Sequence, residues 1–168
     1  NTGIDCFGPF LVKRARSEVK RYGLIFCCFS TRAVHLELLS DLSTDSFLNA
    51  FRRFVSRRGT PDAVWSDNAT NFVGGQRAMF KLDESVLREH SLAPNVKWHY
   101  NVPHASHMGG VWERLIRTVR KVLTGVLPRN ARLTDECLHT VLCEVEFIVN
   151  SRPLTKVSRS GSSLSLVL

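Results

Sequence analysis

Apolar residues in the first forty positions follow the spacing of β-strands. Residues 22–30 are almost continuously apolar, which is typical of a central strand covered on both faces. A shorter run at 4–7 is stopped by Gly8-Pro9 and resumes at 10–12, before a charged segment at 13–21. Residues 33–39 alternate, which predicts Val34, Leu36 and Leu38 on one face and His35 and Glu37 on the other. We therefore expect an antiparallel meander of three strands.

Later segments repeat apolar residues at helical spacing. The first follows Ser43 and Thr44, either of which can cap it, and ends at Gly59. A second covers 109–127, and a third starts at 134–136 and ends at 150–153. Short strands are predicted at 63–66 and 95–100, with one or two helices at 72–90 between them. The apolar stripes expected to be buried in the last two helices are Trp112, Leu115, Ile116, Val119, Val122, Leu123 and Val126, then Leu138, Val141, Leu142, Val145, Ile148 and Val149.

Length and charge narrow the class of protein. A chain of 168 residues with 43% hydrophobic residues is long enough for one domain with a sizeable core. The net charge of +8 favours a polyanionic partner, above all nucleic acid, although a generally basic surface is the alternative. No run of 18 apolar residues exists, so no membrane span is expected, and no signal peptide is visible. The chain begins almost inside its first strand, as an excised domain would.

Five cysteines are present, without a Cys-x-x-Cys pair. They are Cys6, Cys27, Cys28, Cys137 and Cys143. We interpret them as buried small apolar residues in a reducing compartment, and not as zinc ligands or disulfides.

Three acids lie where strands or helices begin or end. Asp5 is in an apolar strand, Asp67 directly follows another strand, and Glu113 is in the first turn of the helix at 109–127. Each has a structural alternative: an exposed edge acid, an Asx turn or helix cap, and a helix-dipole partner, respectively. If the first and fourth strands are neighbours, however, their acids lie side by side and the later helix can bring Glu113 to them. Carboxylates gathered in this way require cations, and oxygen ligands suit Mg²⁺ or Mn²⁺.

Two groups of basic residues are candidates for DNA binding. One is on the helix that carries Glu113 and comprises Arg114, Arg117, Arg120 and Lys121. The other is on the first helix and comprises Arg52, Arg53, Arg57 and Arg58. The alternative is a solvated charged face, which is the stronger interpretation for the first helix. His104 and His107 are either simple loop residues or groups that assist proton transfer or contact DNA.

Six motifs, in order, resemble the integrase catalytic core of retroelements, most closely the BEL/Pao retrotransposon group. They are Asp5-Cys6-Phe7-Gly8-Pro9-Phe10, Thr31-Arg32-Ala33-Val34-His35-Leu36-Glu37, Arg57-Arg58-Gly59-Thr60-Pro61, Ser66-Asp67-Asn68-Ala69-Thr70-Asn71-Phe72, Gly109-Gly110-Val111-Trp112-Glu113-Arg114 and Asn150-Ser151-Arg152-Pro153-Leu154. The resemblance covers about residues 1–155 as one catalytic core. Residues 156–168 are a Ser-rich tail that we expect to be poorly ordered.

The resemblance implies an α/β fold of the RNase H-like kind: a five-stranded mixed sheet, with three antiparallel strands and then two parallel ones, flanked by helices. It also implies an Asp-Asp-Glu site at Asp5, Asp67 and Glu113. That site would hold two Mg²⁺ or Mn²⁺ ions for 3′-end processing of DNA and strand transfer into a target. Asn68 is similar to an integrase residue that orders the loop or contacts DNA. A homodimer or higher oligomer is implied, as is action on chromosomal DNA in the nucleus, with a cytoplasmic particle stage.

Some positions depart from the family pattern. Ala69 stands where many relatives have Gly, and Ser106 replaces a common Pro. The interval from Asp67 to Glu113 is longer than in retroviral integrases but suits the BEL/Pao group. Two other functions stay open: another RNase H-like nuclease that cleaves without joining, and a domesticated, non-catalytic module for DNA binding or oligomerisation.

Overall fold

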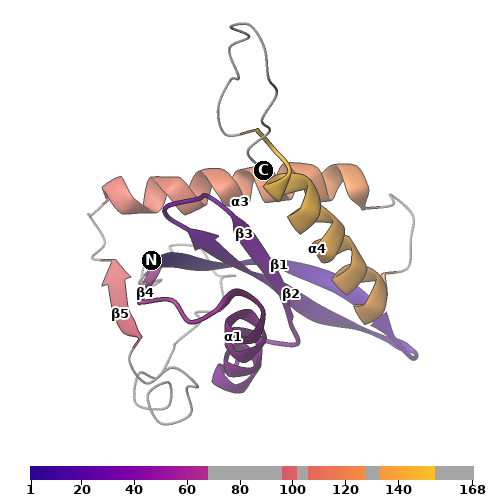
Figure 1. Ribbon diagram of the computed structural model, residues 1–168. Helices are drawn as coiled ribbons and strands as arrows, with labels where there is room; N and C mark the ends of the chain where they lie inside the picture. Colours follow the sequence, from indigo (N-terminus) through magenta and orange to yellow (C-terminus); the bar gives the residue numbers. More distant parts are fainter. Residues whose placement is uncertain (68–95, 102–105, 128–132, 154–168) are drawn as a thin grey trace, which may run out of the picture.

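The sheet has five strands, three antiparallel and two parallel, as the sequence predicts. The computed structural model describes residues 1–67, 96–101, 106–127 and 133–153 (Figure 1). The strand order is β3-β2-β1-β4-β5. Antiparallel pairing joins β1 to β2 and β2 to β3, whereas β1, β4 and β5 run parallel. The strands are β1 (Thr2–Arg14), β2 (Ser17–Cys28), β3 (Val34–Leu39), β4 (Ala63–Asp67) and β5 (Lys97–Asn101).

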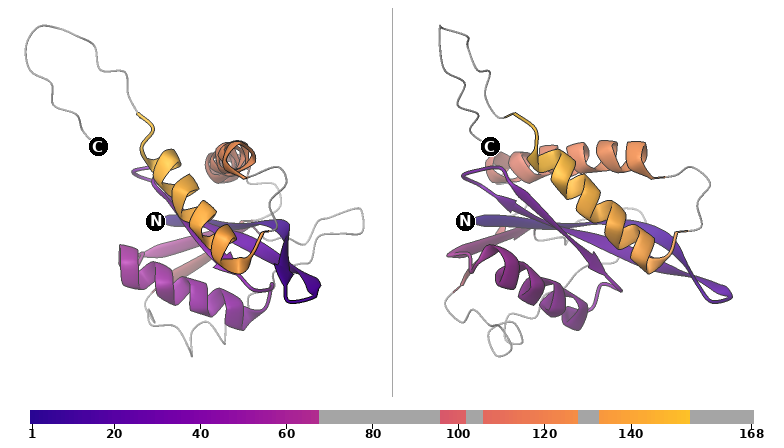
Figure 2. Two further views of the ribbon diagram at one scale, coloured as in Figure 1. Left: turned by 90° about the vertical axis from the view of Figure 1, so that its right-hand side faces the viewer. Right: turned by 45° about the vertical axis from the view of Figure 1, so that its right-hand side comes forward.

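Helices cover both faces of this sheet. On one face lies α1 (Thr44–Arg58), and on the other lie α3 (Ser106–Val126) and α4 (Asp135–Asn150), as Figure 2 shows. Alternation along the strands divides the core into two clusters. Ile4 and Phe26 pack with α1, while Phe7 and Ile25 pack with α3 and α4. The fold is therefore α/β, with a three-layer arrangement.

The helix ends follow the signals in the sequence. Ser43 caps α1, since its side chain accepts a hydrogen bond from the Ser46 amide, and Gly59 ends the helix with a φ of 86°. Thr134 caps α4 in the same way. The third helix begins at Ser106, three residues before the predicted start at Gly109. Both caps and the glycine stop confirm the predicted helix boundaries.

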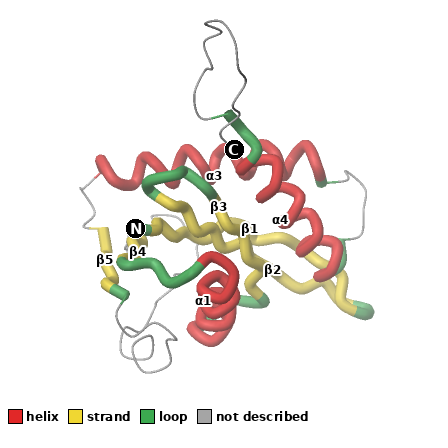
Figure 3. The backbone as a smooth tube through the Cα atoms, in the orientation of Figure 1, coloured by secondary structure: helices red, strands yellow, loops and turns green. Residues whose placement is uncertain are grey.

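The first two strands form one long hairpin, coloured as strand in Figure 3. Gly8-Pro9 does not stop β1. It forms an irregularity between Phe7 and Phe10, after which pairing with β2 resumes and continues through the predicted charged segment. The Phe7 ring lies against Gly23 on β2, and a Cβ added to Gly23 would stand 2.3 Å from its Cζ. This close approach requires glycine at position 23.

Two side-chain predictions are wrong. Ile148, predicted in the buried stripe of α4, is 44% exposed, because the buried stripe is narrower than the periodicity indicated. Cys143 on the same helix is exposed, whereas Cys27 is buried as predicted and all five cysteines are free. His35 lies on the face opposite Val34 and Leu36, as the alternation predicts, and both His35 and Glu37 are buried there. Among the helices described, none is long and apolar enough to cross a membrane.

Candidate active site and its supporting network

Strand pairing places positions 5 and 67 next to each other. Ile4 on β1 pairs with Ser66 on β4 in parallel register, so Asp5 and Asp67 are the next residues on the two strands. Neighbouring strands lie about 4.7–4.9 Å apart. Asp67 also pairs with Asn101 on β5, which makes it the last residue of an inner strand. The structure thus meets the condition on which the three-acid hypothesis depends, namely that the first and fourth strands are neighbours.

Asp5 is half-buried on the sheet face that α3 and α4 cover. It is two residues before Phe7, whose ring packs against both helices. Its Oδ1 accepts a hydrogen bond from the Cys6 amide at 2.7 Å. Burial, together with the neighbouring Asp5 charge, raises the pKa of the Cys6 thiol far above its usual range. Because the thiolate is disfavoured there, Cys6 is a poor candidate for a nucleophile or a metal ligand.

The helix that carries Glu113 lies over the face to which Asp5 belongs. Leu115, Ile116 and Val119 of α3 are buried in the cluster that contains Phe7. Glu113 is within α3, and its side chain is outside the described residues, as is that of Asp67. Asn68 and His104 are also outside them, and His107 is described only as part of α3. The fold therefore brings the backbones of Asp5 and Asp67 together and sets the Glu113 helix on the same face.

The donor set fits a divalent cation. Two carboxylates on adjacent positions of parallel strands repel each other unless a cation neutralises them. Their oxygen atoms are the ligands that Mg²⁺ and Mn²⁺ prefer. Among side chains that the structure describes, no three acidic, His or Cys groups gather to hold a metal, and the side chains of Asp67 and Glu113 are not in that set.

An exposed basic face runs along α3. Arg114, Arg117, Arg120 and Lys121 are all exposed, while the apolar residues of the helix face the core. These four are the residues predicted to face DNA, and their exposure is also what the alternative of a solvated charged face requires. Guanidinium and ammonium groups arranged on one side of a rigid helix can contact successive phosphates of a nucleic acid.

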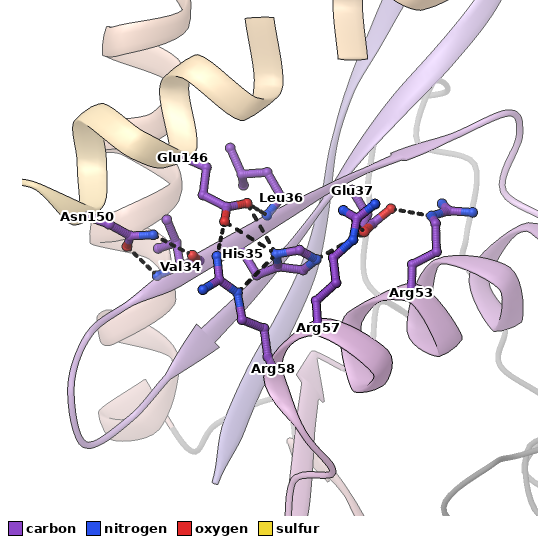
Figure 4. A network of polar contacts seen from close by, with 9 residues as sticks. All are labelled: Val34, His35, Leu36, Glu37, Arg53, Arg57, Arg58, Glu146 and Asn150. Atoms are coloured by element: carbon purple, nitrogen blue, oxygen red, sulfur yellow. Dashed lines mark hydrogen bonds and ion pairs between the residues drawn. The ribbon is translucent and has the colours of Figure 1, made fainter. Parts of the chain in front are cut away.

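A buried polar network joins β3 to α1 and α4 (Figure 4). At its centre is His35, with Nε2 3.0 Å from Oε1 of Glu37 and Nδ1 3.2 Å from Oε2 of Glu146. Burial alone would lower the pKa of His35, but the hydrogen bonds to the two carboxylates outweigh it, and the pKa is raised. The two carboxylates therefore favour the charged form of the imidazole more than water does.

Arginines of α1, on the other side of β3 from α4, pair with the two carboxylates of this network. Arg53 Nε donates to Glu37 Oε2 at 2.5 Å, and Arg57 Nη1 lies 3.4 Å from Glu37 Oε1. Arg58 donates to Glu146. Burial would raise the pKa of Glu37, but hydrogen bonds from His35 and Arg53 hold it below its usual range.

The outer edge of β3 is covered by side chains of the two helices. Asn150 of α4 exchanges two hydrogen bonds of 2.8 Å with the backbone of Val34, and Glu146, one helical turn earlier, accepts from the Leu36 amide at 2.8 Å. Arg53 of α1 donates to the Leu38 carbonyl. These bonds occupy backbone groups that an edge strand otherwise leaves open to pairing with another chain.

The network gives the arginines of the first helix a structural role. Three of its four arginines, Arg53, Arg57 and Arg58, form ion pairs with the internal carboxylates Glu37 and Glu146. Their charge is balanced by these carboxylates, which favours the structural interpretation of the charged face of this helix. The sequence did contain a signal, because the alternating strand placed a histidine and a glutamate together next to a helix rich in arginine.

Searches with protein-family models and among curated proteins found no match to this chain. Solved structures do resemble it. The catalytic core domain of BIV integrase is 12% identical with a TM-score of 0.65, and the match covers 92% of this chain and 86% of that one. The HTLV-2 integrase catalytic core domain in complex with magnesium, in a trimeric form, is 14% identical with a TM-score of 0.59, covering 93% and 88%.

A third similar structure is a chain of the simian T-cell lymphotropic virus intasome in complex with the PP2A regulatory subunit B56 gamma. It is 11% identical with a TM-score of 0.63, and the match covers 99% of this chain. This chain spans only 59% of the length of that one. Together these similarities show that the chain has the fold of retroviral integrase catalytic cores.

Proposed function

We propose that this chain is the catalytic core of a retroelement integrase of the BEL/Pao type, which processes DNA 3′ ends and transfers the strands into target DNA. The observation that supports this most is the parallel register of β1 and β4. It puts Asp5 and Asp67 on adjacent positions in a sheet that has the topology of an integrase core.

In this proposal Asp5, Asp67 and Glu113 hold two Mg²⁺ or Mn²⁺ ions. Such ions, when bound, lower the pKa of an attacking water or 3′-hydroxyl and stabilise the leaving oxygen. Asp5 and Asp67 would share one ion, and Asp5 and Glu113 the other. The rigid sheet fixes the spacing of the two aspartates, and no protein nucleophile is required.

The basic face of α3 would hold the DNA. Arg117 and Lys121 lie one helical turn apart on the exposed side, where they can bind phosphates, with Arg114 and Arg120 beside them. Asn68, next to Asp67, would order the adjoining loop or contact DNA.

We further propose that the chain works as a homodimer or higher oligomer, in the nucleus. Phe147 and Ile148 on α4 are 73% and 44% exposed, which is a high exposure for large apolar residues on a helix. A trimeric form and an intasome among the similar structures also support assembly.

The test is a resealing assay on branched DNA that mimics a half-integrated product, with Mn²⁺ present. We expect the unchanged chain to reseal the DNA and Asp67→Asn to abolish the reaction. Mutation of an outer-shell partner of a metal costs about 10–100-fold, so loss of a ligand itself should exceed about 100-fold. Asp62→Asn is the matched control, because Asp62 is exposed at the opposite end of β4.

The other outcomes separate the alternatives. Full activity in Asp67→Asn would refute the site. Cleavage without rejoining would favour an RNase H-like nuclease. No activity, together with no Mn²⁺ binding by calorimetry, would favour a domesticated module without catalysis.

A further inference from the structure

The β1–β2 hairpin extends past the rest of the sheet. Pairing with β3 reaches only Tyr22 of β2, and pairing with β4 involves only residues 2–4 of β1. Residues 10–14 and 17–21 pair with each other, and no third strand joins them in the part of the chain that the structure describes. This distal half is a two-stranded ribbon that projects at the lower right of Figure 1, beyond the start of α4.

One face of the ribbon is anchored to the segment that leads into α4. Val12 is fully buried, and the Lys13 amide donates to the Leu133 carbonyl at 2.7 Å. Arg21 makes a two-point ion pair with Asp135, with Nε–Oδ1 at 2.6 Å and Nη2–Oδ2 at 3.1 Å. A two-stranded ribbon alone is marginally stable, and these contacts hold this one in place.

The other face and the tip are basic and exposed. The exposed cations are Lys13, Arg14, Arg16 and Lys20, and the exposed acid on the ribbon is Glu18, which pairs across the strands with Lys13. Arg21, in contrast, is only 8% exposed and already neutralised by Asp135. With four exposed cations and one exposed acid, the ribbon presents an excess of positive charge.

We propose that this ribbon binds the phosphate backbone of duplex DNA, as a contact separate from the basic face of α3. The proposal rests on the proposed function, which makes DNA the polyanion that the chain meets. Lys13 and Arg14 end β1, and Arg16 lies in the two-residue turn between β1 and β2, so the three cations gather at the tip. A cluster of this size can contact two or three neighbouring phosphates of one DNA strand, which advance about 3.4 Å each along the helix axis.

The chemistry of the ribbon indicates positioning and not sequence recognition. Lysine and arginine at the tip supply charge and hydrogen-bond donors to phosphate oxygens. Because the ribbon is fixed to α4 through Arg21 and Asp135, it binds as a preformed arm and loses little freedom on contact. The length of the ribbon extends the surface on which target DNA or retroelement DNA can lie.

The experiment measures the salt dependence of binding of the whole chain to a fluorescent random-sequence DNA duplex. Each phosphate contact contributes about 0.9 to the slope of log affinity against log salt. Replacing Lys13, Arg14 and Arg16 by Gln should reduce that slope by about 2–3, whereas Glu18→Gln should tighten binding. Should the triple variant fail to fold, Arg16→Gln alone at the exposed tip should reduce the slope by about 0.9.

Comparison with α3 separates this proposal from the proposed function. Arg117→Gln with Lys121→Gln should reduce the slope independently of the ribbon variants. An unchanged slope in the folded ribbon variants, with a reduced slope in the α3 pair, would overturn the ribbon contact and leave the integrase proposal intact. Binding of the same variants to poly-glutamate is measured as well. If the ribbon variants bind poly-glutamate more weakly but bind DNA as the unchanged chain does, the partner is an acidic protein and the proposal is overturned. Failure of the proposed function itself is recognised separately, by the resealing assay.

Discussion

Replacing Glu37 by Gln tests whether the buried network holds the fold together. The substitution keeps the shape of the side chain and removes its charge. Glu37 is 1% exposed, and its carboxylate accepts from His35, Arg53 and Arg57. An amide in its place has one oxygen, and it presents an N–H₂ group to partners that are themselves donors.

The expected cost follows from how buried each partner is. The contact between His35 and Glu37 is buried on both sides, and a hydrogen bond to a charged group contributes about 1.5–3 kcal/mol. The side chains of Arg53 and Arg57 are 41% and 51% exposed, so solvent screens them and each adds about 0–1 kcal/mol. We therefore expect Glu37→Gln to lower the free energy of unfolding by about 2–4 kcal/mol.

Urea unfolding followed by circular dichroism gives this quantity. With a slope of about 2 kcal/mol per molar urea, the midpoint should fall by about 1–2 M. Glu144→Gln is the control, since Glu144 is exposed on α4, and its effect should stay within about 0.5 kcal/mol. If the two variants were equally stable, the network would not carry the stability assigned to it.

The same variant tests the charge on His35. Its pKa is raised above the ordinary 6.5, so its contribution is fully present below that pH and is lost as pH rises through the folded-state value. The pKa values of Glu37 and Glu146 are lowered from 4.5, so their contributions are present above that pH and are lost as pH falls. Stability from the network should therefore be greatest between pH 4.5 and 6.5.

Above that window the unchanged protein should lose stability, and Glu37→Gln should lose less, because one of the two carboxylates that favour the imidazolium is gone. The other charges facing His35 are those of Glu146 and Arg58, and they are the same in both proteins. Parallel pH profiles for the two proteins would show that His35 is neutral in the fold.

Two further substitutions test the packing of β1 and β3. Gly23→Ala would place a Cβ 2.3 Å from the buried Phe7 ring. We expect it to lower the free energy of unfolding, measured with urea, by about 1–3 kcal/mol. Adding Phe7→Leu to the same chain should restore part of that free energy. Asn150→Ala removes both hydrogen bonds to Val34 and should lower the free energy of unfolding by about 1–3 kcal/mol. The control is Asn49→Ala at an exposed position in α1, which should be neutral or slightly stabilising. Equal effects of the two substitutions would contradict the role of Asn150.

Elements with one strong local signal could be predicted from the sequence. The apolar run at 22–30 became an inner strand, and the caps Ser43 and Thr134 and the stop Gly59 set helix ends. The geometry of a helix cap or a helix stop depends on residues within four positions of it, so local sequence patterns are enough to predict it. The order of strands and helices, read together with the motifs, also gave the topology correctly.

Features that depend on distant partners could not be predicted in this way. Whether Ile148 is buried depends on which face of α4 meets the sheet. The periodicity of α4 is compatible with a wider apolar stripe than the one that is buried against the sheet. The charged segment at 13–21 gave no sign of a ribbon, because its anchor is Asp135, more than a hundred residues away in sequence. Alternation placed His35 on the correct face of its strand, but it cannot show that α1 covers that face and buries the imidazole.

The motifs that resemble integrases have two different physical roles in this fold. The first and fourth contribute Asp5 and Asp67, whose adjacency follows from β1 and β4 being parallel neighbours. The second, third and last meet at β3: His35 and Glu37 pair with arginines of the third motif, and Asn150 of the last binds the strand edge. Because β3 and β4 lie on opposite sides of β1 and β2, damage to the network should reduce stability before it alters the aspartate pair. Glu37→Gln should therefore retain resealing activity at temperatures where it is still folded, and Asp67→Asn should lose activity without losing stability.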